Sequence, residues 1–145
     1  MTLDTAVAPI RPHAATSVAE ALEPFETVEA WPSGKLLFRE GTQPNGVYYV
    51  HSGEVDLCFS SPKTGGAKSL LTVDAGQILG LTSVVSGRPH DCSATARSAC
   101  ITGFIPKERF LTLLDEKPAL WLTVLRMISA NINACWDCMR ALSAR

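Results

Sequence analysis

The sequence has no hydrophobic run long enough to cross a membrane or to act as a secretion signal. The first 25 residues are interrupted by Asp4, Pro9 and Arg11, among other breaks, and contain no apolar stretch of signal-peptide length. No later segment reaches the roughly 18 consecutive apolar residues of a spanning helix. We therefore expect a soluble, cytoplasmic protein with no membrane partner.

An excess of charge of either sign is also missing. The 13 Lys and Arg residues nearly balance the 14 Asp and Glu residues, which gives a net charge of -1. Proteins that bind nucleic acid or anionic membranes usually carry a dense basic patch, and no Lys/Arg block occurs here. We therefore expect no direct binding to DNA.

Cysteine and histidine are too few and too scattered to predict a disulfide framework or a metal centre. The five cysteines are an odd number, none precedes Cys58, and the three histidines show no metal-ligand spacing. No P-loop, nucleophile elbow or G-x-G-x-x-G motif occurs, so we expect no enzyme activity, metal or cofactor. The C-x-x-C spacing of Cys135 and Cys138 leaves a thiol redox sensor open as an alternative.

The length of 145 residues is typical of one domain, and 46% hydrophobic with 19% charged residues is a globular composition. Residues 1–16 are rich in Ala, Pro and Thr without periodicity and predict a loose tail, which leaves 17–145 as the domain. A short helix is expected next, with Ser17 as its N-cap, Glu20 as the capping-box partner and Pro24 near its end.

The segment from Val28 to Ile105 consists of short β-prone runs separated by glycines, which predicts a mainly β sandwich or barrel. Residues 46–51 are strand-like, and 54–59 alternate apolar and polar residues as a half-buried strand does. Residues 63–66 predict a hairpin tip, with a returning strand at 70–73.

Two helices are expected after this region. Pro106 suits a first helical turn, and the following stretch has an apolar face of Phe110, Leu111, Leu113 and Leu114. No Gly or Pro occurs from Ala119 to Arg145, which predicts a long helix over 118–142.

The long helix carries two apolar stripes. One consists of Leu120, Val124 and Met127 and is expected to cover the β domain. The other is spaced alternately by four and three residues, which is typical of a coiled-coil seam. We expect this seam to form a homodimer interface, through Trp121, Leu125, Ile128, Ile132, Cys135, Met139 and Leu142.

The order of local motifs resembles the effector domain of Crp/Fnr regulators, a branch of the cyclic-nucleotide-binding superfamily. The residues that carry it include the runs 34–38, 47–50, 52–55, 93–96 and 105–106, followed by the long helix. The resemblance implies a mainly β fold with flanking helices: a double-stranded β-helix, or jelly roll, plus a long C-terminal dimerisation helix.

The resemblance also places a phosphate-binding cassette at 80–94, where a short helix offers backbone N–H groups to an anion. It implies ligand-binding positions at Gly80, Leu81, Thr82, Ser83, Arg88, His90, Cys92, Ser93 and, from the long helix, Trp136. The family's ribose-binding carboxylate falls on Leu81 and its phosphate-binding arginine on Cys92. Tight binding of cAMP or cGMP is therefore not expected, and a cyclic nucleotide or another small anionic ligand is left open as the occupant.

We therefore expect a ligand-sensing signalling domain of the kind used in transcription regulation, with a degenerate cassette. The winged helix-turn-helix of the family would need further residues after Arg145, so no DNA-binding module is expected. On this interpretation Leu81→Glu with Cys92→Arg would create cAMP binding. Two alternatives are a dimeric scaffold with a vestigial pocket and the thiol redox sensor.

Overall fold

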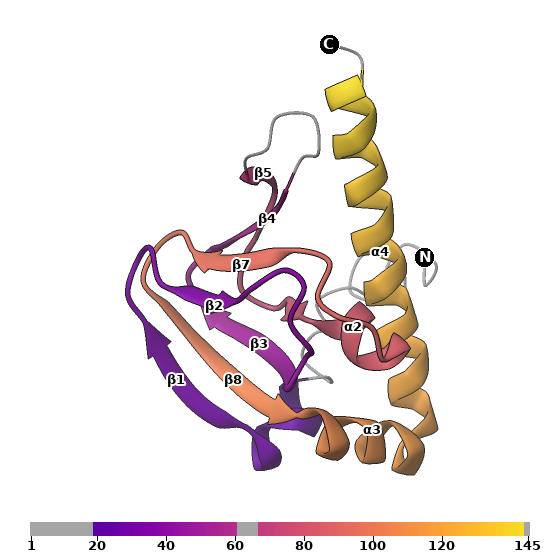
Figure 1. Ribbon diagram of the computed structural model, residues 1–145. Coiled ribbons are helices and arrows are strands. Elements are labelled where there is room, and N and C mark those ends of the chain that lie inside the picture. Colours follow the sequence, from indigo (N-terminus) through magenta and orange to yellow (C-terminus); the bar gives the residue numbers. More distant parts are fainter. Residues whose placement is uncertain (1–18, 61–66, 144–145) are drawn as a thin grey trace, which may run out of the picture.

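The computed structural model describes residues 19–60 and 67–143, with the side chains of 59–70 and 131–143 outside that description. Its strands form two four-stranded antiparallel sheets that face each other, and helices lie against one side (Figure 1). The expected jelly roll with a long C-terminal helix is confirmed. The predicted tail at 1–16, Ser17 and the hairpin tip at 63–66 lie outside the described residues.

The first sheet has, in spatial order, β1 (Thr27–Trp31), β8 (Cys100–Pro106), β3 (Gly46–Ser52) and β6 (Ile78–Leu79). The second has β2 (Leu36–Phe38), β7 (Ser93–Ala96), β4 (Val55–Ser60) and β5 (Ala67–Val73). Residues 19–22 are helical and continue into η1 (Glu23–Phe25). The other helices are α2 (Leu81–Ser86), α3 (Lys107–Glu116) and α4 (Pro118–Ser143).

The three predicted strands and the two predicted helices are present with nearly the expected bounds. The side chains of β3 alternate between the two faces of the sheet, as expected for a strand. Val47 and Tyr49 face the helices, and Val50 faces the other sheet. Pro106 is the N-cap of α3, which begins one residue later.

A first core lies between the two sheets. Every strand contributes at least one buried residue to this core, which therefore holds the two sheets together. Its members are Trp31, Leu37, Val50, Val55, Val73, Leu79, Ala94, Ala96 and Cys100.

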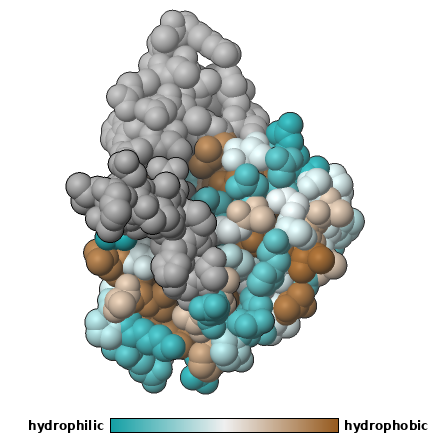
Figure 2. Space-filling view, turned by 180° about the vertical axis from the view of Figure 1, so that it is seen from behind, coloured by the Kyte–Doolittle hydropathy of each residue, from teal (hydrophilic) through white to brown (hydrophobic). Residues whose placement is uncertain are grey.

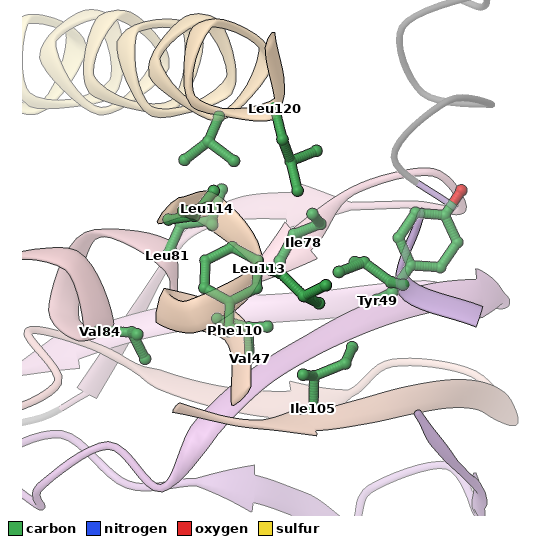
Figure 3. Packing of buried hydrophobic residues seen from close by; sticks show 12 residues of the cluster. Val47, Tyr49, Ile78, Leu81, Val84, Ile105, Phe110, Leu113, Leu114 and Leu120 are labelled. Atoms are coloured by element: carbon green, nitrogen blue, oxygen red, sulfur yellow. The ribbon is translucent and has the colours of Figure 1, made fainter. Parts of the chain in front are cut away.

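A second core lies between the first sheet and the helices (Figure 3). Phe110, Leu113 and Leu114 of α3 are completely or almost completely buried in it. The expected covering stripe of α4 is confirmed, since Leu120 and Val124 are buried there and Met127 packs against the same cluster. These contacts hold α4 along one side of the roll (Figure 1).

The predicted dimer seam is only partly exposed in the single chain, and the dimer stays a prediction. Trp121 and Ile128 are half-buried and pack against the protein's own second core, whereas Leu125 is 52% exposed. The most exposed large hydrophobic residue on the described part of α4 is Leu122, at 55%, which the predicted seam did not include. Successive residues are 100° apart on a helix, so Trp121 and Ile128 flank the buried stripe. The seam residues from Ile132 to Leu142 lie outside the described side chains.

No helix within the described residues is long and apolar enough to cross a membrane. Seen from behind, the described residues show hydrophobic and hydrophilic side chains side by side over the same surface (Figure 2).

One buried polar contact offers a test of the first core. Trp31 Nε1 donates to Thr102 Oγ1 at 2.9 Å, and Thr102 is completely buried. Thr102→Val keeps the shape and leaves the indole N–H without an acceptor, so we expect the free energy of unfolding to fall by about 1–3 kcal/mol. Urea unfolding measures this loss. The matched exposed variant, Thr112→Val, should change it by less than about 0.5 kcal/mol; equal effects would contradict the assignment.

Candidate functional site

A pocket of about 470 Å³ opens beside α2 and the loop that follows it. Its lining combines hydroxyl groups, one imidazole and one charge of each sign. The lining residues are Thr82, Ser83, Ser86, Arg88, Pro89, His90 and Asp91. All seven belong to the expected cassette at 80–94, and four of them are predicted ligand-binding residues, namely Thr82, Ser83, Arg88 and His90.

Two glycines fix the short helix that forms one wall. Gly80 precedes α2 with φ +86° and Gly87 follows it with φ +77°, both in the left-handed region that side chains disfavour. A Cβ atom on Gly80 would lie 3.2 Å from the Gly46 carbonyl oxygen and 3.4 Å from the His90 ring. Gly80 therefore allows the chain to turn tightly into α2 close to His90.

The loop after α2 is tied back to the helix through its serines. The Ser83 hydroxyl donates to the Pro89 carbonyl at 3.4 Å. The Ser86 hydroxyl accepts from the Arg88 N–H at 3.3 Å and donates to the Ser83 carbonyl at 3.5 Å. These bonds shape the pocket, and the hydroxyl oxygens retain capacity to bind a ligand.

His90 is one of the two buried polar side chains of the pocket, together with Ser83. It is 5% exposed and stacks on Phe38 of β2, with ring centroids 3.9 Å apart and 15° between the planes. Burial lowers the pKa of His90, while the Asp91 carboxylate raises it to a smaller degree. The balance favours a neutral imidazole at neutral pH.

Leu81 lies away from the described pocket, and its predicted ligand contact stays a prediction. Its side chain is 2% exposed and belongs to the second core, where Figure 3 shows it beside Leu114. The position follows Gly80 as in the family pattern, but α2 turns this apolar side chain toward α3. Leu81 does not line the described pocket.

Two further residues of the predicted ligand-binding set, Cys92 and Ser93, also lie elsewhere. Cys92 is half-buried and does not line this pocket. Ser93 begins β7, and its hydroxyl accepts from the Glu40 N–H at 2.9 Å, which joins β7 to the end of β2. The side chain of Trp136 lies outside the description, so its predicted ligand contact stays a prediction.

Sequence reasoning missed three lining residues, Ser86, Pro89 and Asp91. The signal for Ser86 was present, because Thr82 and Ser86 are four residues apart and share one helix face. Pro89 and Asp91 enter the pocket through the path of the loop, which no spacing rule predicts.

Metal chemistry finds no support in the described part of the chain. It contains no group of three or more His, Cys, Asp or Glu side chains that could hold a metal ion. Cys58 and Cys100 are present there as thiols. The C-x-x-C pair of Cys135 and Cys138 lies outside the described side chains, so the redox alternative stays untested.

The chain matches the family model of the cyclic nucleotide-binding domain over residues 28–117. That span is well over half of the sequence and includes both sheets, α2 and α3. The chain belongs to the cyclic nucleotide-binding domain family. The match ends at Lys117, so it covers the cyclic nucleotide-binding domain itself and leaves α4 outside.

Solved structures share the fold at low sequence identity. The catabolite activator protein of Thermus thermophilus has a TM-score of 0.73 and 22% identity, over 87% of this chain and 58% of that one. A cyclic nucleotide-binding domain from Methylobacillus flagellatus has a TM-score of 0.74 and 23% identity, over 86% of this chain and 70% of that one. The expected likeness to Crp/Fnr effector domains is confirmed for the fold.

A curated relative places the same kind of domain inside a much longer protein. Lysophospholipase NTE1 of Eremothecium gossypii is 27% identical over 125 residues, which are 86% of this chain and 8% of that enzyme. The chain thus spans less than a tenth of the length of this relative.

Proposed function

We propose that this chain is a non-enzymatic, ligand-sensing regulatory domain in which a small molecule binds beside α2. One observation carries the proposal: the two faces of α2 serve two different environments. Thr82 and Ser86 face the pocket, whereas Leu81 and Val84 are buried in the core beneath α3 and α4. A shift of this six-residue helix on ligand binding would therefore disturb the packing of the long helix.

The ligand acts through its preference for one of two arrangements of α2. A molecule that binds both arrangements equally would change nothing. Leu81 and Val84 meet Phe110, Leu120 and their neighbours in a closely packed cluster, and such cores resist continuous deformation. This favours a discrete repacking of α4 as the response.

We further propose that α4 forms a homodimer. Its seam shares Leu125 and Ile132 with the predicted one but begins at Leu122 instead of Trp121. Leu122 and Leu125 are exposed on α4, and in the sequence the alternating spacing of four and three continues from them to Ser129, Ile132 and Trp136. A stripe with this spacing, apolar except at Ser129, suits a two-stranded coiled coil between two copies.

The ligand is proposed to be a small polar or anionic molecule other than cAMP. Leu81 offers no carboxylate to a ribose hydroxyl, and the neutral His90 supplies less charge to a phosphate than an arginine would. The family membership and the regulators with the same fold support a regulatory role. The activity in the name of the lysophospholipase is not carried over, since the match covers 8% of that enzyme.

Native mass spectrometry of the purified full-length chain tests the proposal. We expect a co-purified small molecule, lost on denaturation and absent from Thr82→Tyr, in which a bulky ring blocks the pocket from an exposed position. The matched variant Thr112→Tyr places the same ring on exposed α3 and should keep the molecule. Thermal shift with cAMP, cGMP and other nucleotides then ranks candidates.

A protein that carries no small molecule and shows no shift with any nucleotide would contradict ligand sensing. It would favour the scaffold alternative, in which the dimer helix is the functional surface. A bound molecule that survives Thr82→Tyr would contradict the location of the site.

A further inference from the structure

The backbone fixes His90 on both sides, so its ring position is well defined. Its carbonyl accepts from the Gly41 N–H at 2.8 Å, and its own N–H donates to the Thr42 carbonyl at 2.9 Å. These two bonds attach the loop to the segment after β2, where Phe38 supplies the aromatic face for the imidazole. A ring held in this way cannot swing out into solvent without breaking the contact with Phe38.

The polar edge of this ring has no protein partner. Within the part of the chain that the structure describes, neither ring nitrogen of His90 makes a hydrogen bond, and no fully enclosed side-chain nitrogen or oxygen lacks a partner. The nitrogens therefore reach the pocket that the same side chain lines. An almost buried imidazole without a protein hydrogen bond at either nitrogen can therefore offer a hydrogen bond to a molecule bound in this pocket.

Charges around the ring cancel when it is neutral. Within the pocket Arg88 and Asp91 carry opposite charges, and both are exposed at its rim. The segment that follows β2 again supplies one cation, Arg39, and one anion, Glu40. The α2 wall supplies only hydroxyl groups, so the described pocket gains a net positive charge when His90 takes up a proton.

We propose that the pocket binds a small oxyanion together with one proton, which is taken up by a ring nitrogen of His90. This inference rests on the proposed function, because it identifies the ligand class and the regulation of the same pocket. The imidazolium and Arg88 bind the anion, and the hydroxyl of Thr82 donates to another of its oxygens. The stacked Phe38 ring also favours the charged imidazole through a cation–π contact.

The coupling has a definite sign. Burial disfavours the imidazolium in the empty pocket, and a bound anion raises the pKa of His90 again. By linkage, the anion must then bind more tightly as the pH falls through this range, and more weakly as His90 loses its proton. The domain would thus respond to the anion and to acidification together.

The test is an NMR titration of the imidazole signals in the ¹⁵N-labelled full-length protein, from about pH 8 to about pH 5. Sulfate is the probe because its charge stays constant over this range, with chloride at matched ionic strength as the reference. We expect sulfate to raise the apparent pKa of His90 by about one unit, a tenfold coupling. His90→Gln assigns the signal, and His51, which is bonded to Glu26 at 2.8 Å, is the internal control.

Two variants keep the outcome specific to the pocket. Arg88→Ala removes the second cation and should weaken sulfate binding about tenfold with the coupling retained. Arg97→Ala removes an exposed arginine outside the described pocket and should leave the titration unchanged. An identical pKa of His90 in sulfate and in chloride, or an equal shift at His51, would overturn the proton coupling. In that case, a co-purified molecule that is present in the parent protein and lost in Thr82→Tyr would still support the proposed ligand-sensing function.

Discussion

Leu81→Glu is expected to lower the free energy of unfolding by about 4 kcal/mol at neutral pH. The side chain is 2% exposed among apolar residues of the second core. A carboxyl group there is forced toward its neutral form, and burial raises the pKa of such groups by about 3 units, each worth 1.36 kcal/mol. Because small domains have only about 5–15 kcal/mol of stability, urea or thermal unfolding should detect this loss readily.

Two neighbouring variants isolate the cause. Thr82→Glu adds the same charge at the next, exposed residue and should cost less than about 0.5 kcal/mol. Leu81→Met keeps an apolar side chain of similar volume and should cost less than about 1.5 kcal/mol. Unchanged stability of Leu81→Glu would mean that residue 81 faces the pocket, as the family pattern suggested.

The same reasoning changes the expectation for restored cAMP binding. On the sequence alone, Leu81→Glu with Cys92→Arg completes the family's pair of ligand-binding side chains. In the structure the first change places a carboxyl group in the core and the second lies outside the described pocket lining. We now expect the double variant to lose stability and to bind cAMP no better than the parent.

Leu122→Glu with Leu125→Glu is expected to convert the dimer to monomers in sedimentation velocity. The two leucines are 55% and 52% exposed in the single chain, so the substitutions should leave the domain folded. Burying one leucine contributes about 1.5–3 kcal/mol. Losing both therefore removes at least about 3 kcal/mol per copy, or about 6 kcal/mol per dimer, which corresponds to a dissociation constant raised about 10,000-fold.

Ala75→Glu with Ala99→Glu is the matched control, since it adds the same charge at exposed positions of the β domain and should stay dimeric. Ile128→Glu should behave differently from both, because Ile128 packs on the protein's own core and its loss lowers the melting temperature. A Leu122→Glu, Leu125→Glu protein that remains a dimer would rule out this face of α4, and a monomeric parent would rule out the dimer.

Local signals in the sequence were sufficient for the elements. Glycine punctuation and period-two alternation predicted the β region, and Pro106 with the breaker-free stretch after Pro118 predicted α3 and α4. These signals are local because turns, strands and helices depend on residues a few positions apart. The family motifs then predicted how the elements assemble.

The sequence predicted which segment forms the candidate site, but not which of its side chains line the pocket. Thr82, Ser83, Arg88 and His90 do line one pocket, whereas Leu81 does not. A family pattern assigns roles by order along the chain. It cannot tell that an apolar residue in the place of a carboxylate will turn toward α3, because burial of its surface decides that.

The sequence by itself determined the strands, the helices, the cassette segment and an apolar excess on the long helix. Tertiary structure alone decided which sides these residues face. Leu122 is more exposed than Trp121 or Ile128 because of how α4 is oriented about its axis. In this orientation Leu120 and Val124 are buried in the second core. The His90 ring is held at the pocket because it stacks on Phe38, which lies 52 residues earlier in the sequence. Such long-range contacts depend on the packing of the whole domain, and no local period encodes them.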